Sequence, residues 1–324
     1  MLNEMKYVYT VYEEKSFSKA AKKLYVTQPA LSHMVRKAEE EVGALIFDRS
    51  TIPLTVTQEG MYYIKSVEEI LFIQRNLKAY FKDLNELNAG SLSIGGSSFF
   101  CSFVLAEIIG RFKNKYPNVT IDLREGNIKE LKKELEEETL DLVMETALSS
   151  DDITIEKYLY NYETIILAVP SSYDINKRIQ PYKLNYQDIV TERFLSDSIS
   201  AVPLEVFKDV PFIMMKSGND MYQRSTMMCK HVGFVPKTAI LMDQVLTSYN
   251  IASSGVGAVF IRSNIIKFMP ENQKLVYYKI GDPLATRKIL IASKKGKYLT
   301  SAMREFLKMA GAKKIDKAEE KEKN

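Results

Sequence analysis

The sequence contains few of the residues that bind metals or form disulfides. Among its 324 residues there are only two cysteines, Cys101 and Cys229, and two histidines, His33 and His231. None of them shows a CxxC or Cys/His spacing that would suggest zinc, and two histidines are too few for a histidine-rich metal site. Free cysteines are usually buried, and we expect two buried thiols here. A redox switch stays open as the alternative.

Long apolar runs are also missing. No stretch approaches the ~18 consecutive apolar residues of a membrane-spanning helix. Charged residues, Glu4 and Lys6 among them, interrupt the first residues of the chain, which argues against a secretory signal. We therefore expect a cytoplasmic protein with no membrane contact. The composition, 46% hydrophobic and 27% charged, is that of a soluble globular protein, and the length suits two or three compact units.

Catalytic and nucleotide-binding motifs are absent as well. Gly95-Gly96 and Gly255-x-Gly257 match neither the dinucleotide-binding fingerprint nor the phosphate-binding loop. There is no GxSxG nucleophile elbow, and no Ser/His/Asp set is credible. The sequence predicts a protein that is not an enzyme and that needs no cofactor.

A local excess of positive charge lies near the N-terminus. The net charge of the whole chain is only +4. Between residues 15 and 37 there is no acidic residue, and the basic ones are Lys15, Lys19, Lys22, Lys23, Arg36 and Lys37. Acidic clusters at 13–14 and 39–41 flank this window. The pattern favours a polyanion bound at one place, and an ordinary solvated helix face is the alternative.

Three short helices are predicted within the first 43 residues. The first has apolar residues spaced by three and four. Ser18 is predicted to cap the second helix. Thr27 is predicted to cap the third, which has Pro29 in its first turn and ends at Gly43.

The third helix has two contrasting faces. Its apolar face consists of Leu31, Val35, Ala38 and Val42. The opposite face has short or hydrogen-bonding side chains, namely Pro29, Ser32, His33 and Arg36, with Gln28 on its flank. Within this helix, no carboxylate occurs before Glu39. A helix that enters the major groove needs donors and acceptors in its N-terminal half and no carboxylates facing phosphate. With the short turn before it, this helix predicts a helix-turn-helix.

A hairpin is predicted after the third helix. Two apolar runs, 44–47 and 54–56, enclose a polar turn that contains Pro53. Such a hairpin is the wing of a winged helix. Arg49, at its start, is predicted to contact phosphate or the minor groove. A salt bridge from Arg49 to Asp48 or Glu59 is the alternative.

These segments resemble a known family. The run FSKAAKKLYVTQPALS, residues 17–32, and the run EEEVGALIFDR, residues 39–49, are similar to the signature of LysR-type transcriptional regulators. The resemblance implies a winged helix-turn-helix over residues 1–58 that binds double-stranded DNA. The predicted DNA-binding residues are Ser18, Lys19, Thr27, Gln28, Pro29, Ser32, His33, Arg36 and Arg49. His33 stands where the family usually has arginine, and Ala38 where it usually has leucine. We expect an altered base preference from the first departure and a smaller core from the second.

A long helix is predicted to follow the wing. Thr57 is a plausible cap, and no proline occurs between residues 57 and 88. Residues spaced alternately by four and three form a seam: Tyr63, Val67, Ile70, Gln74, Leu77, Phe81 and Leu84. We interpret residues 59–89 as a linker helix that pairs with a second copy of the chain, as the resemblance also implies. Packing of this helix against its own domain is the alternative.

Strands and helices alternate after residue 90, which predicts a largely parallel sheet. Strands are expected at 92–96, 119–123, 140–144, 164–169, 194–195, 211–215, 239–241, 256–261, 275–280 and 288–292. The resemblance implies an α/β two-lobed effector-binding domain of the type 2 periplasmic-binding-protein-like class. One lobe would comprise 90–161 plus 266–310 and the other 162–265. The tail, 311–324, is predicted to be disordered because it is nearly all charged.

A ligand cleft is expected beyond the carboxyl ends of the strands. The candidate effector-binding residues there are Ser97, Ser98, Phe99, Thr146, Ser217, Asn219 and Gln244. Hydroxyl groups and free N–H groups at helix starts suit a small anion such as a carboxylate or phosphate. The alternative is that the serine and asparagine side chains only cap helices.

The sequence as a whole predicts a DNA-binding transcriptional regulator controlled by a small molecule. A homodimer or homotetramer would bind an inverted-repeat operator. A solute-binding protein, a metabolite sensor without gene-specific regulation and an enzyme on an α/β scaffold are the other hypotheses. The sequence does not identify the effector or the target genes, and it leaves activation versus repression open.

Overall fold

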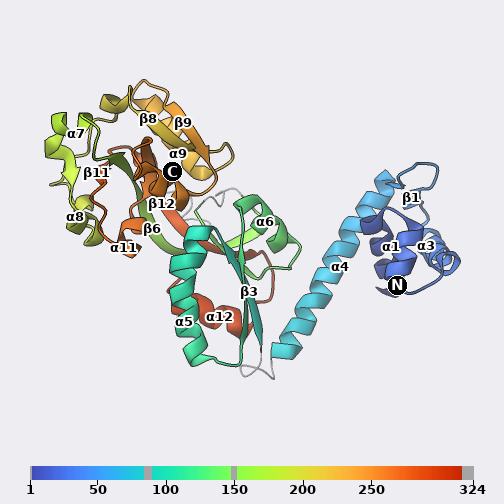
Figure 1. The fold of residues 1–324 in the computed structure, drawn as a ribbon. Helices are drawn as coiled ribbons and strands as arrows, with labels where there is room; N and C mark the ends of the chain where they lie inside the picture. Colours follow the sequence, from blue (N-terminus) through green and yellow to red (C-terminus); the bar gives the residue numbers. More distant parts are fainter. Residues whose placement is uncertain (1, 84–89, 147–151, 316–324) are drawn as a thin grey trace. The chain divides into compact units, whose positions relative to one another are not determined.

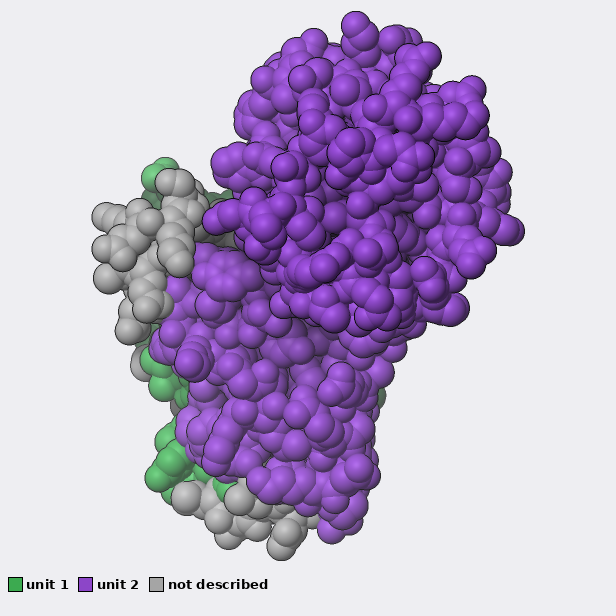
Figure 2. Space-filling model, turned by 90° about the vertical axis from the view of Figure 1, so that its left-hand side faces the viewer, with its two compact units in different colours: residues 1–85 green, residues 86–324 purple. Residues whose placement is uncertain are grey.

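The computed structural model describes residues 2–83, 90–146 and 152–315 (Figure 1). The chain forms two compact units, residues 1–85 and 86–324, coloured green and purple in Figure 2. The first unit has the expected order of elements: α1 (Leu2–Glu14), α2 (Phe17–Lys23), α3 (Gln28–Val42), β1 (Phe47–Asp48), β2 (Thr55–Val56) and α4 (Gln58–Asp83). Strands β1 and β2 pair antiparallel, so the predicted wing is a short hairpin.

The ends of the short helices show which local signals were correctly interpreted. Thr27 caps α3, because its hydroxyl accepts the Ala30 N–H, and Gly43 ends the helix in the left-handed region at φ 73°. The predicted cap of α2 is wrong. Ser16, not Ser18, has the extended backbone of a cap, and its hydroxyl accepts the Lys19 N–H.

The core of the first unit is small and is made where four helices and the wing meet. Leu31, Val35 and Ala38 of α3 are buried, as expected. They pack with residues of α1, α2, the wing and α4, namely Val8, Val11, Ala20, Ala21, Ile46, Phe47 and Ile64. Val42 was predicted to share this face, but its side chain is 49% exposed because it lies in the last turn of α3.

Helix α4 uses its two halves differently. The Thr57 hydroxyl accepts the Gly60 N–H at 2.8 Å and so caps the helix. Close to this end, Tyr63 packs on the core of the first unit and Val67 is buried. For these two positions the alternative prediction, that the helix packs against its own domain, is therefore correct. Further along, Leu77 and Phe81 are 56% and 58% exposed. Leu84, the last predicted seam position, lies outside the described residues.

The second unit is an α/β fold with one continuous sheet path, β4-β3-β5-β12-β6-β10-β8-β9. The strands are β3 (Ser91–Gly96), β4 (Thr120–Glu125), β5 (Leu142–Glu145), β6 (Ile155–Pro170), β7 (Lys183–Leu184), β8 (Pro211–Met215), β9 (Lys237–Met242), β10 (Ala258–Arg262), β11 (Leu275–Lys279), β12 (Thr286–Lys294) and β13 (Lys313–Lys314). The α-helices are α5 (Ala106–Lys115), α6 (Ile128–Glu136), α7 (Ile175–Arg178), α8 (Tyr186–Val190), α9 (Asp220–His231), α10 (Val245–Ala252), α11 (Asn264–Phe268) and α12 (Ser301–Ala310). A π-helical turn, η1 (Phe100–Leu105), leads into α5.

Two lobes share the long strand β6. Residues 155–164 of β6 pair with β12 in the first lobe, and residues 165–170 pair with β10 and β11 in the second. Each lobe has three parallel strands, β4-β3-β5 in the first and β10-β8-β9 in the second. The antiparallel strands β6 and β12 join the two halves, so the sheet is mixed rather than largely parallel.

Alternating side chains of β5 divide the first lobe into layers. Leu142 and Met144 pack with the cluster that holds residues of α5 and α12, and Val143 packs with Leu131 and Leu135 of α6. Because successive side chains of a strand point to opposite faces, α5 and α12 cover one face of the sheet and α6 covers the other (Figure 1).

Three predictions about the second unit are wrong. Residues 194–195 are part of the 3-10 turn Arg193–Leu195 rather than a strand. Strand β11 pairs with β7 and with the second-lobe half of β6, although residues 266–310 were assigned to the first lobe. Lys313 and Lys314 pair with β6 and are therefore ordered in the structure, while residues 316–324 lie outside the described part. Within the described ranges, no helix is long and apolar enough to cross a membrane.

Candidate functional sites

The first candidate site is the outward face of α3. Gln28, Pro29, His33 and Arg36 are exposed and Ser32 is half-buried, while Ser18, Lys19 and Thr27 are exposed nearby. This is the arrangement expected from the sequence: the apolar side of α3 is in the core and its hydrogen-bonding side is accessible. The local reason is the cap at Thr27 together with Pro29, which start the helix just where the polar face begins.

Ion pairs lower the number of basic side chains that are available to a polyanion in the basic window, residues 15–37. Lys23 pairs with Glu13 at 3.2 Å and Glu14 at 2.9 Å, and Lys37 pairs with Glu4 at 2.9 Å. Within the described ranges Lys19, Lys22 and Arg36 form no ion pair. Glu13 and Glu14 of one flanking cluster and Glu4 of α1 therefore neutralise two of the lysines. The positive charge that remains accessible comes from the exposed side chains of Lys15, Lys19, Lys22 and Arg36.

Arg49 has a partner that the sequence did not indicate. Its Nη2 lies 2.8 Å from Oε2 of Glu39, its Nη1 donates to the Ser32 hydroxyl at 3.4 Å, and the guanidinium lies over the Phe17 ring. Among the described contacts of Arg49, neither of the two expected alternatives, Asp48 and Glu59, is a partner. The Asp48 carboxylate instead accepts hydrogen bonds from the hydroxyl and N–H of residue 50, which lower the pKa of Asp48. Arg49 is thus positioned between α3 and the wing.

Glu39 joins α3 to the wing. Its Oε1 accepts the N–H groups of Ile46 and Phe47 at 2.9 and 3.3 Å, while Oε2 binds Arg49. The residue is only 5% exposed. A buried carboxylate needs such partners because an uncompensated charge is costly in the interior. Sequence reasoning placed Glu39 only in an acidic cluster that flanks the basic window. It missed this role, since the partners of Glu39 lie seven to ten residues further along the chain.

The second candidate site is a cavity of about 590 Å³ in the second unit. It is lined by the segments that follow β3, β4, β5, β8 and β9, so the carboxyl ends of five strands surround it. Six of the seven predicted effector residues line it: Ser97, Phe99, Thr146, Ser217, Asn219 and Gln244. Ser98 is not among the lining residues, because the chain turns into the helix after Ser97 and directs it elsewhere.

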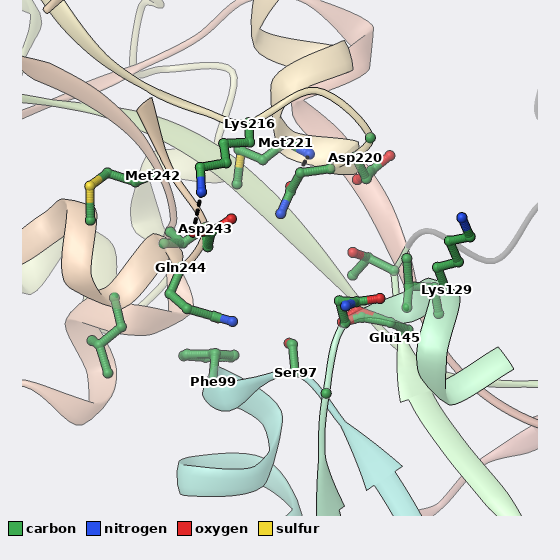
Figure 3. A pocket seen from close by; sticks show the side chains of 18 of the residues that line it. Ser97, Phe99, Lys129, Glu145, Lys216, Asp220, Met221, Met242, Asp243 and Gln244 are labelled. Atoms are coloured by element: carbon green, nitrogen blue, oxygen red, sulfur yellow. Dashed lines mark hydrogen bonds and ion pairs between the residues drawn. The ribbon is translucent and has the colours of Figure 1, made fainter. Parts of the chain in front are cut away.

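The capping alternative is correct for one of these residues. The Asn219 side chain accepts the Met221 N–H at 2.9 Å and so caps α9. Gln244 precedes α10, and its side chain makes no capping bond to the described residues of that helix. Figure 3 shows the Gln244 side chain extending into the cavity next to Phe99, with Lys216 and Asp243 paired above them.

Sequence reasoning missed the charged part of the lining. The segment 125–130 lies at the carboxyl end of β4. The expectation that a ligand cleft lies beyond the carboxyl ends of strands applies to this segment as it does to the other loops. Glu145, Arg262 and Arg287 also line the cavity. They lie inside or at the ends of buried strands, where single-sequence reasoning expects apolar residues, so only the fold reveals them.

A buried ionic network stands behind the cavity. Nε of Arg287 donates to Oε1 of Glu163 at 2.6 Å, and Nη1 of Arg262 donates to Oε2 of the same carboxylate at 3.3 Å. Arg287 also pairs with Asp220, whose carboxylate binds Arg224 at 3.0 Å. The network joins β6, β10, β12 and the start of α9, so it fixes the junction of the two lobes.

At the cavity end of this network, some polar atoms make no hydrogen bond to the described part of the chain. The described atoms include three buried ones beside the cavity without a hydrogen bond: Ser97 Oγ, Arg262 Nε and Arg287 Nη2. Glu145 is 5% exposed, and the pKa of its carboxyl is raised because burial outweighs the attraction of Arg262 and of the neighbouring Ser97 hydroxyl. Buried polar groups are normally satisfied, so unsatisfied ones beside a cavity indicate a ligand.

The two cysteines are buried, as expected. Burial raises the pKa of Cys101 to about 11 and that of Cys229 to about 12. Both are therefore thiols at neutral pH, which disfavours the thiolate chemistry that a redox switch requires.

Comparisons with known proteins match both units. The sequence profile described as "Bacterial regulatory helix-turn-helix protein, lysR family" matches residues 2–61, and that described as "LysR substrate binding domain" matches residues 85–314. The uncharacterized HTH-type transcriptional regulator YcgK of Bacillus subtilis is 25% identical over 310 residues, covering 94% of this chain and 92% of that protein. A probable RuBisCO transcriptional regulator of Emiliania huxleyi is 24% identical over 309 residues, covering 95% of this chain and 93% of that protein. Among solved structures, HinK, a LysR family transcriptional regulator from Pseudomonas aeruginosa, has a TM-score of 0.54 at 21% identity, covering 96% of this chain and 97% of that one.

Proposed function

We propose that this chain, which belongs to the LysR family of DNA-binding transcriptional regulators, recognises its operator with the exposed face of α3. Gln28, Ser32, His33 and Arg36 would contact bases or adjacent phosphates, since they occupy the N-terminal half of α3 and are accessible. Lys19 and Pro29 would lie beside them, while Ser18, Thr27 and Arg49 would position the module. The observation that carries the proposal is the accessible polar face of α3, on which no carboxylate precedes Glu39.

The protein would act as a homodimer through α4. Ile73, Leu77 and Phe81 present large exposed apolar side chains on the second half of this helix. Exposed apolar side chains at helical spacing favour pairing with another helix. A symmetric partner that offers the same face is a second copy of the chain, and two copies of α3 would then bind the two halves of an inverted repeat. Assembly of dimers into a tetramer is compatible with the same helix pairing.

The cavity of the second unit would hold the effector. A small molecule with an anionic group fits the unsatisfied donors of Arg262 and Arg287. Binding would change the equilibrium between lobe arrangements only by its differential affinity for them, typically about 1–3 kcal/mol. We propose that it is bound without turnover, which agrees with His33 lying on α3 and His231 pairing with Asp282, away from the cavity lining. We propose a cytoplasmic location for the protein, since a regulator works in the compartment that holds its target DNA.

The test begins with selection of genomic fragments that the purified protein binds, followed by fluorescence anisotropy on the selected operator. Arg36→Ala is expected to weaken operator binding by roughly tenfold to hundredfold, because a base-contacting arginine contributes about 1–3 kcal/mol. Arg178→Ala, which removes an exposed arginine of α7, is the matched control and is expected to bind normally. Equal operator affinity of the Arg36 and Arg178 variants would refute the assignment of α3.

A further inference from the structure

The deep wall of the cavity carries a carboxylate that no cation of the described residues neutralises directly. Glu145 is the last residue of β5, which lies between β3 and β12, and this central position in the sheet buries its side chain. Among the residues that the structure describes, no lysine or arginine nitrogen lies within ion-pair distance of its carboxylate. A buried carboxylate in this situation is expensive, and proteins rarely keep one without a purpose.

The nearby arginines are already engaged with other acids. Arg262 and Arg287 share the carboxylate of Glu163, and Arg287 also binds Asp220. Their attraction reaches Glu145 only from a distance, and burial dominates, so the pKa of Glu145 is raised. What Glu145 lacks is a charged N–H donor in direct contact, and its side chain lines the space from which such a donor would approach.

The same wall also offers unsatisfied donors. Nε of Arg262 and Nη2 of Arg287 make no hydrogen bond within the described part of the chain. Both arginine side chains are more than nine-tenths buried and line the cavity. An anionic group of a ligand would satisfy them. One wall of the cavity therefore presents an acceptor for a cation beside donors for an anion.

The lining also has an apolar part, which lies beside the Lys216–Asp243 ion pair. Phe99, Met221, Met242, Val245 and Leu246 contribute to it. In the view of Figure 3, Phe99 and Gln244 lie on one side of the cavity and Glu145 on the other, with Ser97 between Phe99 and Glu145. A ligand whose charged head lies at Glu145 would direct its side chain toward Phe99 and the two methionines.

We propose that the effector is a zwitterionic amino compound with an apolar side chain, whose ammonium group binds the Glu145 carboxylate and whose acidic group binds the donors of Arg262 and Arg287. The proposal rests on the proposed function, because it takes the cavity as the effector site. It narrows a generally anionic effector to one that also carries a cationic nitrogen.

The experiment uses full-length protein and isothermal titration calorimetry with matched compounds. L-Leucine, L-phenylalanine and L-methionine are each compared with the amine that lacks the carboxylate and with the carboxylic acid that lacks the amino group. At least one amino acid is expected to bind no less than tenfold more tightly than both of its analogues. Binding of the acid as tight as that of the amino acid, or no binding by any of the three amino acids, would overturn the proposal.

Variants assign the effect to Glu145. Glu145→Gln is expected to weaken binding of the amino acid at least tenfold and to leave binding of the acid analogue unchanged or stronger, while Glu145→Asp retains part of the affinity. Glu137→Gln, which removes an exposed carboxylate outside the cavity, is the control and binds as the wild type does. Equal losses for the amino acid and the acid would contradict an ammonium contact.

Operator binding is measured on the same proteins without ligand. It distinguishes a failure of the proposed regulator function from a failure of the proposed effector chemistry. Its loss in the Arg36→Ala variant tests the regulator function, whatever the effector is. Retained binding of the acid analogue by Glu145→Gln shows that the second unit is folded, so that a loss of amino-acid binding in this variant reports on the contact with Glu145.

Discussion

Glu39→Ala should detach the wing from α3. The substitution removes the acceptor of the Ile46 and Phe47 N–H groups and the partner of Arg49. Ile46 and Phe47 are each 1% exposed, so water does not readily replace the lost acceptor. Each buried donor left unsatisfied costs about 1–3 kcal/mol, whereas the Arg49 ion pair contributes about 0–1 kcal/mol because the arginine side chain is 35% exposed. The expected loss is about 2–5 kcal/mol, since the costs are not fully additive.

The measurement is hydrogen exchange by mass spectrometry on the full-length protein. Peptides over residues 44–57 report the opening free energy of the wing separately from the second unit. Glu39→Gln keeps one carbonyl acceptor and should lose about half as much as Glu39→Ala. Glu41→Ala, on the same helix and exposed, is the matched control. If the alanine variants at 39 and 41 change the opening free energy of these peptides by the same amount, the role assigned to Glu39 is wrong.

Two further predictions concern α4 and the cavity. Leu77→Asp and Phe81→Asp should each dissociate the dimer, because each would place a charge in an apolar interface between two helices. Sedimentation at micromolar concentration would then show half the mass. A dimer of unchanged stability would contradict pairing through α4. Glu145→Gln should raise the melting temperature of the ligand-free protein at pH 7, and the gain should shrink as the pH falls toward 5. The sign follows from the raised pKa of Glu145 in the folded protein, because the folded state binds this proton more tightly than the unfolded state does. Glu145 therefore begins to destabilise the fold as the pH rises above its ordinary pKa of 4.5. The destabilisation is complete once the pH exceeds the pKa in the folded state. A gain that is the same at pH 5 and pH 7 would contradict it.

Local signals in the sequence predicted local structure well. Helix α3 begins at Thr27 and Pro29 and ends at Gly43 as expected, because capping and left-handed turns depend on the few residues around them. The cap of α2 was misplaced by two residues, since Ser16 and Ser18 are equally good hydrogen-bond acceptors and only the backbone conformation distinguishes them. Strand ends likewise identified most of the cavity lining, because parallel strands place their carboxyl ends on the same edge.

Contacts between distant segments were beyond such signals. Nothing near Glu39 in the sequence indicates that its carboxylate bridges to the wing. Glu145 follows an apolar strand and resembles a solvated strand end, yet pairing with β12 buries it. Lys313 and Lys314 belong to a charged tail by composition, but pairing with the first-lobe half of β6 orders them as a strand. In each case a long-range partner outweighs local propensity.

The shared strand β6 has a mechanical consequence. The chain passes between the lobes at only two places within the described residues, along β6 near residue 164 and between β11 and β12. Two adjacent crossings would act as a flexure for any rotation of one lobe relative to the other. Glu163 lies at this flexure, and Arg287 pairs opposite it. Points close to a pivot move least, so these ionic contacts can survive a rotation that displaces the cavity rim at Lys129 and Lys216 much further. The two lobes, produced as separate proteins, should fail to fold, because neither half retains a complete sheet.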